Sequence, residues 1–398
     1  MSVRGTWSQI AAVTSLNLQT LPSRWQTAMV TVVGIAGVVL VVVGVFSIAA
    51  GLRATLELSG ADDVAFILRG GSSDEMQSGL GPDSVRVVGD APGVARDAAG
   101  PLVSAELFVS VDLRSKSTGA MATVPMRGVG AQAPKLRGNF KLVSGRYLTR
   151  GTNEIVVGAG ARGQFEGLEV GRSLRLGTST WTIVGVFSDA GSVAESELWS
   201  DASVLQGAFN RGNSYQSIRV RLESPAAFRP FKDSLTSDPR VNLRILTERE
   251  YLEFLSGSLR TIVRVVGFTI ALLMGLGAVF GALNTMYSAV ASRTREIATL
   301  RALGFGGAAV TISVLIEALL LGLIGALVGG AFAYLAFNGL QTSTLNFTSF
   351  TQVTFAFRVT GALLGGAILY ALALAFAGGL LPGIKAARMP VTAGLREL

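Results

Sequence analysis

The sequence predicts a membrane α-helical protein with four transmembrane helices and a large extracytoplasmic α+β domain between the first and the second. Four long apolar segments divide the chain of 398 residues, and a polar region, 52–260, separates the first two. Arginines gather in the connections rather than in the apolar segments. The mean hydropathy of +0.50 lies between the values expected for a soluble domain and for a chain that is all membrane.

The first apolar segment, Ala28–Gly51, has 24 residues without a charge, and a bilayer core takes about 20. It is too long for the apolar part of a signal peptide. The preceding stretch, Ser15–Gln26, mixes leucines and Trp25 with polar residues. That composition suits either a short amphipathic segment in the membrane interface or a flexible lead-in.

Three further spans are expected at 265–290, 308–337 and 359–381. All three are rich in glycine and alanine, as in GLGAVFGAL, GLIGALVGG and GALLGGA. Small residues let transmembrane helices approach one another closely. We therefore expect these helices to pack tightly through their glycine faces.

Basic residues outnumber acidic ones in the N-terminal segment, in the connection between the second and third apolar segments, and in the C-terminal tail. They are Arg4, Arg24, Arg293, Arg295, Arg301, Lys385, Arg388 and Arg396, whereas the connection 338–357 carries no charge. Positive charge marks the cytoplasmic side. The pattern predicts cytoplasmic termini, a cytoplasmic second-to-third connection, and an extracytoplasmic location for 52–260 and 338–357.

The large polar region has the texture of a mixed α+β domain, with two lobes as one arrangement. Its β-like runs are DDVAFIL, SVRVVG, ELFVSVDLR, NEIVVG, WTIVGVF and SIRVRL. Its helical stretches are 203–209, 226–236 and 248–264, the last of which leads directly into the second span.

Composition excludes several classes of function. The chain has no cysteine and no histidine, which removes thiolate metal sites, most zinc sites and the commonest nucleophile–base pairs. The net charge of +8 does not form a basic patch, since residues 52–260 hold 24 basic and 23 acidic side chains. Nucleic-acid binding is therefore disfavoured.

The sequence offers no convincing nucleotide-binding motif. Gly158–Gly163 has the form G-x-G-x-x-G after a strand-like run, but no acidic residue ends a second strand at the required distance. A turn and helix start is the better interpretation. No G-x-x-x-x-G-K-[ST] motif occurs, so ATP energy must come from a partner.

The segment SRTREIATLRALGF, 292–305, interrupts the apolar half of the chain. Ser292 can cap a helix start and Gly304 can end one. Between them Ile297, Leu300 and Leu303/Gly304 form an apolar stripe at spacings of three and four. The pattern predicts a short amphipathic docking helix, because a helix of this length needs packing partners. A simple basic loop that fixes the topology is the alternative.

Glu317 is the single charge within the third apolar segment. A buried carboxylate in a membrane costs several kcal/mol unless it is paired or protonated. A structural bond to the second span is the simplest role, with Asn284, Thr285 and Ser288 as candidate partners. A conformational latch and a proton site are the alternatives.

At these residues the chain resembles the MacB/FtsX-type permeases of ABC transporters, also called type VII. Arg293–Gly304 follows the family's R-x-R-E-I-A-x-L-R-A-x-G loop. The tail resembles the family's ending through Gly379, Pro382, Ala386, Ala387, Pro390, Leu395 and Arg396, with Gly383 where alanine is usual. A looser likeness to the outer core domain covers Ser144–Val186, and Glu317 lies where such permeases commonly carry an acid.

The resemblance implies a permease that converts ATP hydrolysis in a partner into movement of the outer domain. Its ATPase-coupling residues would be Arg293, Arg295, Glu296, Leu300, Arg301 and Gly304, with Pro382, Arg388, Pro390 and Arg396 in a cytoplasmic tail. The implied segments are 1–27 (cytoplasmic or interfacial), 28–51 (first span), 52–260 (MacB-like domain), 265–290 (second span), 291–307 (coupling helix), 308–337 (third span), 338–357 (outer loop), 359–381 (fourth span) and 382–398 (tail), with an FtsX-like region at 265–390.

The resemblance also implies partners and a location. These are a separate ABC ATPase that binds ATP and Mg²⁺, a second permease copy or paralogue, membrane lipids and, in some systems, a periplasmic adaptor. It implies no cofactor in this chain, no enzyme activity of its own, and a place in the bacterial cytoplasmic membrane. MacB carries its ATPase at the N-terminus, whereas this chain begins with its interfacial segment, so a separate ATPase is expected.

Three classes of function stay open at this stage. The first is a permease for export or extraction of an amphiphilic, peptide or lipid-linked substrate, with lipoprotein-releasing permeases as a variant. The second is an interaction protein, such as an FtsX-like regulator of a cell-wall hydrolase. The third is a membrane enzyme, which the lack of histidine and cysteine disfavours.

Overall fold

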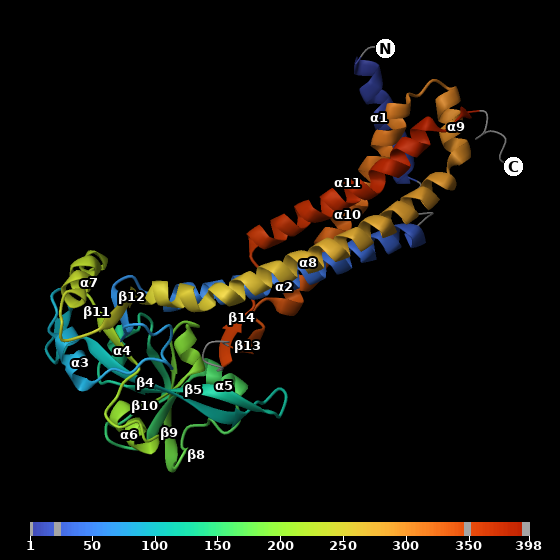
Figure 1. The fold of residues 1–398 in the computed structure, drawn as a ribbon. Helices are drawn as coiled ribbons and strands as arrows, with labels where there is room; N and C mark the ends of the chain where they lie inside the picture. Colours follow the sequence, from blue (N-terminus) through green and yellow to red (C-terminus); the bar gives the residue numbers. More distant parts are fainter. Residues whose placement is uncertain (1–2, 20–24, 346–351, 392–398) are drawn as a thin grey trace. The chain divides into compact units, whose positions relative to one another are not determined.

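The computed structural model describes residues 3–19, 25–345 and 352–391, and these form two compact units (Figure 1). The membrane unit comprises Met1–Ala50, Thr261–Gly339 and Arg358–Leu398. The core domain comprises Gly51–Arg260 and Leu340–Phe357. Helices α2 (Trp25–Ser59) and α8 (Glu248–Ala291) contribute residues to both units.

The described residues of the membrane unit are mostly helical. Besides parts of α2 and α8 the unit contains α1 (Val3–Gln19), α9 (Thr294–Ala302), α10 (Gly307–Phe337) and α11 (Gly361–Arg388). Among the residues that the structure describes, four segments are long and apolar enough to cross a membrane: Ala28–Thr55, Thr261–Ala291, Gly307–Phe337 and Gly361–Arg388. The predicted fold class of four such helices with a large α+β domain between the first two is confirmed.

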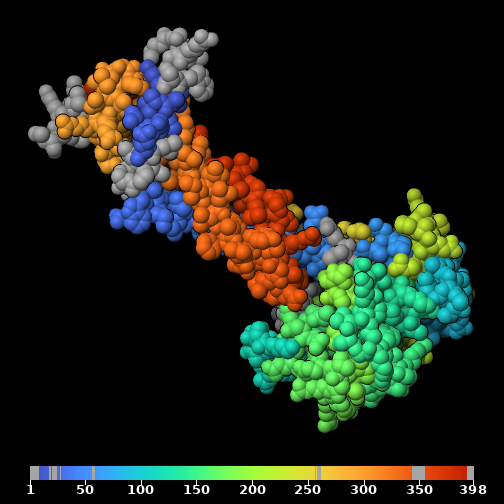
Figure 2. Space-filling model, turned by 180° about the vertical axis from the view of Figure 1, so that it is seen from behind, coloured from blue at the N-terminus to red at the C-terminus, as the bar shows by residue number. Residues whose placement is uncertain are grey.

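The N-terminal segment is helical before the first span. The predicted amphipathic stretch Ser15–Gln26 falls partly on α1, which is longer than expected, and partly on residues 20–24, which lie outside the described residues. Trp25 begins α2 with 60% of its surface exposed. Helix α1 lies against α10, as the neighbouring blue and orange surfaces in Figure 2 show.

Glycine packing is confirmed for the third span. A Cβ on Gly325 would come within 2.8 Å of the Val32 carbonyl oxygen, and one on Gly329 would meet the carbonyl of Ala36. A Cβ on Gly322 would come within 2.5 Å of Ala375 in α11. Helices α10 and α11 run side by side along this contact (Figures 1 and 2).

The same expectation is wrong for the stretch GALLGGA of the fourth span. No described atom lies within 4 Å of a Cβ built on Gly361, Gly365 or Gly366. These glycines begin α11 on a side that no described helix of this chain covers. Glycine content alone does not tell which face of a helix meets a neighbour.

The core domain is built on one long mixed sheet (Figure 1). Its strand order is β12-β1-β11-β4-β5-β10-β7-β9-β6, and β8 also pairs with β9. The strands are β1 (Val64–Arg69), β4 (Val103–Arg114), β5 (Met121–Val129), β6 (Lys141–Gly145), β7 (Glu154–Gly158), β8 (Ser173–Leu176), β9 (Ser179–Ser188), β10 (Leu198–Asp201), β11 (Ser217–Arg221) and β12 (Leu243–Thr247). The short strands β2 (Arg96–Asp97) and β3 (Gly100–Pro101) form a separate pair.

Strand β4 joins the two lobes of the sheet. Its residues 103–106 pair with β11, and its residues 107–114 pair with β5. Each lobe buries its own apolar cluster, one around Phe231 and Ile218 and the other around Trp181 and Phe165. The two-lobed α+β arrangement is therefore present, with the change of partner at Glu106.

Short helices cover the sheet. They are α3 (Pro82–Gly89), α4 (Ala133–Leu136), α5 (Ala159–Gln164), α6 (Ala202–Ala208) and α7 (Phe228–Thr236), with 3-10 turns η2 (Val193–Ser196) and η3 (Pro225–Ala227). The predicted helices at 203–209 and 226–236 are confirmed by α6 and α7, and the helix from Glu248 into the second span is confirmed by α8. The G-x-G-x-x-G stretch is the turn from β7 into α5, as the simpler interpretation expected.

The predicted strand SVRVVG is wrong, because this run forms α3. Pro82 occupies the first turn of the helix, where a proline needs no backbone N–H partner. Val85 and Val88, three residues apart, then both face the apolar cluster of the first lobe. The β-branched residues are thus accommodated on one helical face.

The connection between the third and fourth spans contains a hairpin of β13 (Gln341–Leu345) and β14 (Gln352–Ala356). It belongs to the core domain, where β14 lies against η2. This hairpin was expected only as an uncharged outer loop.

Candidate functional site: the α9 helix and its buried ion pair

Helix α9 begins one residue later than the sequence suggested. Its N-cap is Arg293, not Ser292. The Ser292 N–H donates to the Ser288 carbonyl at 3.0 Å and its hydroxyl donates to the Ala289 carbonyl at 3.0 Å. Ser292 therefore completes α8, because its hydrogen bonds return to the preceding helix rather than capping the next one.

The end of α9 is as predicted. Gly304 has a φ of +95°, which favours glycine, and follows the C-cap Leu303. The Gly304 N–H donates to the Arg301 carbonyl and the Phe305 N–H to the Leu300 carbonyl, each at 3.1 Å. These two bonds form a Schellman motif, which ends the helix and satisfies its last carbonyls.

The predicted apolar stripe of α9 is divided between inside and outside. Ile297 is 7% exposed and packs with Met286 of α8 and Val310 of α10. Leu300 is half-buried, whereas Leu303 is 73% exposed. Arg295, Glu296 and Thr299 are exposed as well. The outward face of α9 thus combines charged residues with one large exposed leucine.

Arg293 lies inside this region and pairs with Glu317. Their side chains are 7% and 6% exposed, and Arg293 Nη1 donates to Glu317 Oε2 at 3.2 Å. Two of the three predicted partners of Glu317, Thr285 and Ser288, instead donate their hydroxyl groups to carbonyls of their own helix. Arg293, predicted as part of the docking surface, is thus buried in this structure and does not lie on the outward face of α9.

The N-terminal helix α1 completes the surroundings of this pair. Arg293 Nη2 donates to the Asn17 carbonyl at 3.1 Å, and the Asn17 amide donates to the Ser313 hydroxyl of α10. The Gly306 N–H donates to Gln9 Oε1 at 3.2 Å. Sequence reasoning missed these contacts, because they join residues almost 300 positions apart.

The C-terminal part of α11 joins the same region. Arg301 Nη1 donates to the Met389 carbonyl at 2.6 Å. Pro382 is buried inside α11, while Arg388 and Pro390 are exposed. Arg396 lies outside the described residues. Arg301 therefore holds the chain after α11 to α9, in addition to any contact with a partner.

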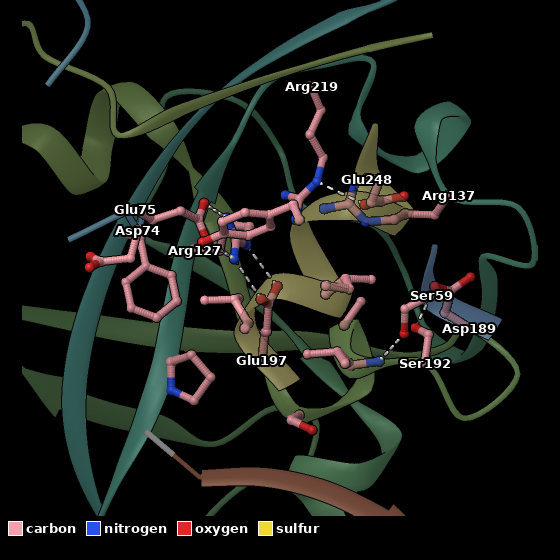
Figure 3. A pocket seen from close by; sticks show the side chains of 18 of the residues that line it. Ser59, Asp74, Glu75, Arg127, Arg137, Asp189, Ser192, Glu197, Arg219 and Glu248 are labelled. Carbon is pink, nitrogen blue, oxygen red and sulfur yellow. Dashed lines mark hydrogen bonds and ion pairs between the residues drawn. The ribbon is translucent and has the colours of Figure 1, made fainter. Parts of the chain in front are cut away.

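A second polar cluster, absent from the sequence-based prediction, lies at the junction of the two lobes of the core domain (Figure 3). Arg127 of β5 donates to Glu75, Glu106 and Glu197 at 2.6–3.0 Å. Arg219 of β11 donates to Glu106, and to Glu248 at the start of α8 at 3.0 Å. The network thus ties both lobes to the first residue of α8.

The arginines keep these carboxyl groups ionised. Burial by itself would raise the pKa of Glu75, but Arg127 outweighs it and lowers that pKa to about 2. Burial likewise opposes the charge of Glu106, and Arg219, Arg137 and Arg127 together hold its pKa below the usual range. A faint signal exists in the sequence, where Glu106, Arg127 and Arg219 each interrupt an apolar strand-like run.

The described residues combine four apolar helices, a two-lobed domain between the first two, and a short capped helix between the second and third. This combination defines a membrane protein of the permease class. Residues 28–238 match the MacB-like periplasmic core domain, and residues 268–391 match the FtsX-like permease C-terminal family. The chain belongs to the MacB/FtsX-type family of ABC transporter permeases.

Individual relatives are more distant. The chain is 25% identical over 262 residues to the macrolide export ATP-binding/permease protein MacB of Bordetella avium (strain 197N), which covers 61% of this chain and 39% of that protein. It is 27% identical over 299 residues to the protein of the same name from Hahella chejuensis (strain KCTC 2396), covering 69% and 43%. The chain thus spans about two fifths of the length of these curated relatives.

Solved structures with similarity include the periplasmic region of MacB from Actinobacillus actinomycetemcomitans. It is 18% identical, covers 50% of this chain and 94% of its own, and gives a TM-score of 0.38. The extracellular domain of the noncanonic ABC-type transporter YknZ from Gram-positive bacteria is 13% identical, covers 46% of this chain and all of its own, and gives a TM-score of 0.33.

Proposed function

We propose that this chain is the membrane subunit of an ABC transporter, in which a separate ATPase drives movement of the core domain. The movement would serve export or extraction of an amphiphilic, peptide or lipid-linked substrate. The permease would act as a dimer with a second copy or a paralogue. It would lie in the bacterial cytoplasmic membrane with both termini and α9 on the side of the ATPase. ATP and Mg²⁺ would be bound by the ATPase.

The observation that carries this proposal is the outward face of α9. A helix of nine residues is too short to be stable alone, and it is held here by Ile297, the Arg293–Glu317 pair and Arg301. The anchors all lie on its inner side, so Arg295, Glu296, Thr299 and Leu303 are left for a partner. An exposed leucine among charged residues is typical of the central contact of a docking surface.

The same geometry suggests how movement is passed on. Helix α8 is unbroken from Glu248 to Ala291, and two residues separate it from α9. Its first residue, Glu248, is held by Arg219 of the buried network. A displacement of α9 by the ATPase would therefore be passed along one hydrogen-bonded helix to a fixed point in the core domain.

The test replaces Leu303 with Asp in the full chain, purified with its ABC ATPase in lipid nanodiscs. Losing a central apolar contact costs about 2 kcal/mol or more, so the affinity for the ATPase should fall by about 30-fold. Leu303→Asp is a cleaner variant than Leu300→Asp, because half-buried Leu300 also lines the small space around Arg293.

Leu142→Asp is the matched control, since Leu142 is 41% exposed on the core domain. The control should bind and stimulate the ATPase as the parent chain does. Full ATPase stimulation by Leu303→Asp, with the protein folded, would exclude the outward face of α9 as the docking surface.

A further inference from the structure

The N-terminal helix α1 contacts both ends of the segment that contains α9. The Gly306 N–H, at the N-cap of α10, donates to Gln9 Oε1 at 3.2 Å. The side-chain amide of Asn17 donates to the Ser313 hydroxyl of α10. The carbonyl of Asn17 accepts from Arg293, the N-cap residue of α9, at 3.1 Å. We call these contacts the α1 clamp, and they hold α9 at its start and just beyond its end.

The spacing of the contacts defines how α1 lies on α10. Gln9 and Asn17 are eight residues apart in α1, and Gly306 and Ser313 are seven residues apart at the start of α10. At a rise of 1.5 Å per residue these separations are about 12 Å and about 10 Å, so the two helices run in the same direction over about two turns. Val13, halfway between the contacts, is 2% exposed. Figure 1 shows α1 and α9 at the same end of the membrane unit.

Helix α1 also closes the surroundings of the buried ion pair. A space of about 20 Å³ lies beside the pair, which is enough for about one water molecule. Val13 and Asn17 of α1 line this space together with Arg293 and Glu317. An ion pair weakens when water reaches it, because water screens the attraction between the charges. The α1 clamp therefore protects the ion pair that fixes the start of α9.

We propose that α1 is a positioning helix for α9, and that stimulation of the ATPase requires α1 to stay seated on α10 through Gln9 and Asn17. The two side chains are positioning residues, which act through Gly306, Ser313 and Arg293. This inference rests on the proposed docking role of α9, and it adds the part of the chain that regulates this role.

Loss of the α1 clamp should affect coupling rather than docking. Leu303, at the centre of the proposed docking surface, is 73% exposed with α1 in place. The ATPase would therefore still bind when α1 is loose. Its push would then move α9 against α10, instead of being passed on to α8.

The first test loosens the α1 clamp in the full chain, purified with its ABC ATPase in lipid nanodiscs. The variant Gln9→Ala/Asn17→Ala removes both side-chain hydrogen bonds. Each is worth about fivefold in an equilibrium, so the maximal stimulated kcat of the ATPase should fall at least about fivefold. The permease concentration that gives half-maximal stimulation should stay within about twofold. Ser15→Ala, at an exposed position of α1, is the matched control and should change neither quantity.

A second readout needs no ATPase. Amide hydrogen exchange in α9 of the permease alone should be at least about fivefold faster in Gln9→Ala/Asn17→Ala than in the parent chain or in Ser15→Ala. If the double variant does not fold, Gln9→Ala alone takes its place and should act in the same direction.

The second test locks the α1 clamp. Asn17→Cys/Ser313→Cys can be joined by a short bifunctional thiol reagent, since the chain has no other cysteine. Before cross-linking this variant lacks the hydrogen bond between the two side chains and should stimulate weakly, and cross-linking should restore the parent level. Ser15→Cys/Ser313→Cys should cross-link poorly, because residues 15 and 17 point about 200° apart on a helix.

Each contrary outcome has a distinct meaning. Full stimulation by the loosened variant would mean that α1 is dispensable for coupling. Loss of stimulation on cross-linking would mean that α1 must leave α10 during the cycle. Unchanged exchange in α9 would mean that α1 does not hold it. Any of these results overturns the inference. A failure of the docking proposal itself differs from all three, because Leu303→Asp would then stimulate fully.

Discussion

A single carboxylate in an apolar helix sets the chemistry of the α9 region. Glu317 is the one charge in α10, and Arg293 supplies its counter-charge from the start of α9. Removing one partner of a buried pair leaves the other charge uncompensated and costs about 3–5 kcal/mol, whereas replacing both by apolar residues is often neutral. The pair therefore fixes where α9 sits, whatever its net contribution to stability.

Glu317→Gln should lower the free energy of unfolding of the full chain by about 3 kcal/mol, because Arg293 keeps its charge but loses its carboxylate. The double variant Arg293→Met/Glu317→Met should recover most of that loss. Unfolding in a graded mixed-detergent titration measures both. Glu296→Gln, at an exposed carboxylate of α9, is the control and should stay near the parent value. Equal stability of Glu317→Gln and the parent would contradict a structural role for the pair.

The buried charges also mark the limit of prediction from the sequence. A charge in an apolar run can be found by inspection, as Glu317 was. Its partner depends on contacts across the chain. Glu106 meets Arg127 from 21 positions away and Arg219 from 113 positions away. The local sequence marks these arginines only by their place in apolar strand-like runs, and it does not tell which carboxylate each arginine meets.

At the scale of helices, the length of each apolar segment was predictable from the sequence. The face that each helix turns towards its neighbours was not. A run of about 20 apolar residues can hardly form anything but a span, so all four spans were found. Which glycines touch a neighbour depends on the rotation of each helix. Gly329 lies against the backbone of α2, whereas Gly366 faces no described atom. Likewise Leu303, placed in the apolar stripe by its spacing, is exposed, because each step of three residues falls about 60° short of a full helical turn and carries the stripe away from the face of Ile297.

Gly329→Ala and Gly366→Ala form a matched pair of substitutions in transmembrane helices. The Cβ at position 329 would collide with the carbonyl of Ala36, so α10 must move away from α2. We expect a loss of stability of about 1–3 kcal/mol, as for other overpacked sites. Gly366→Ala should be neutral or slightly stabilising, because alanine favours the helix.

The same detergent titration checks both variants. If the two substitutions change the stability equally, α2 and α10 do not make the close contact at Gly329. Loss of stability in Gly366→Ala alone would place a neighbour on the face of α11 that no described residue of this chain covers.

At the scale of the whole chain, the sidedness of the connections decides the functional proposal. The coupling role requires α9 on the side where ATP is hydrolysed and the core domain on the other side. The arginines around α9 favour that orientation, since basic connections stay in the cytoplasm. The hairpin β13–β14 groups with the core domain, so both should lie on one side of the membrane.

Single cysteines test this orientation directly, because the chain has none of its own. The variants are Ser117→Cys in the core domain, Gln341→Cys in the hairpin and Thr299→Cys on α9, all at exposed positions. A membrane-impermeant maleimide should label the first two in intact cells and the third only after permeabilisation. Bound ATPase should then protect Thr299→Cys, because that residue lies on the proposed docking face. Labelling of Thr299→Cys from outside would place α9 beyond the reach of ATP, and the coupling proposal would fail with it.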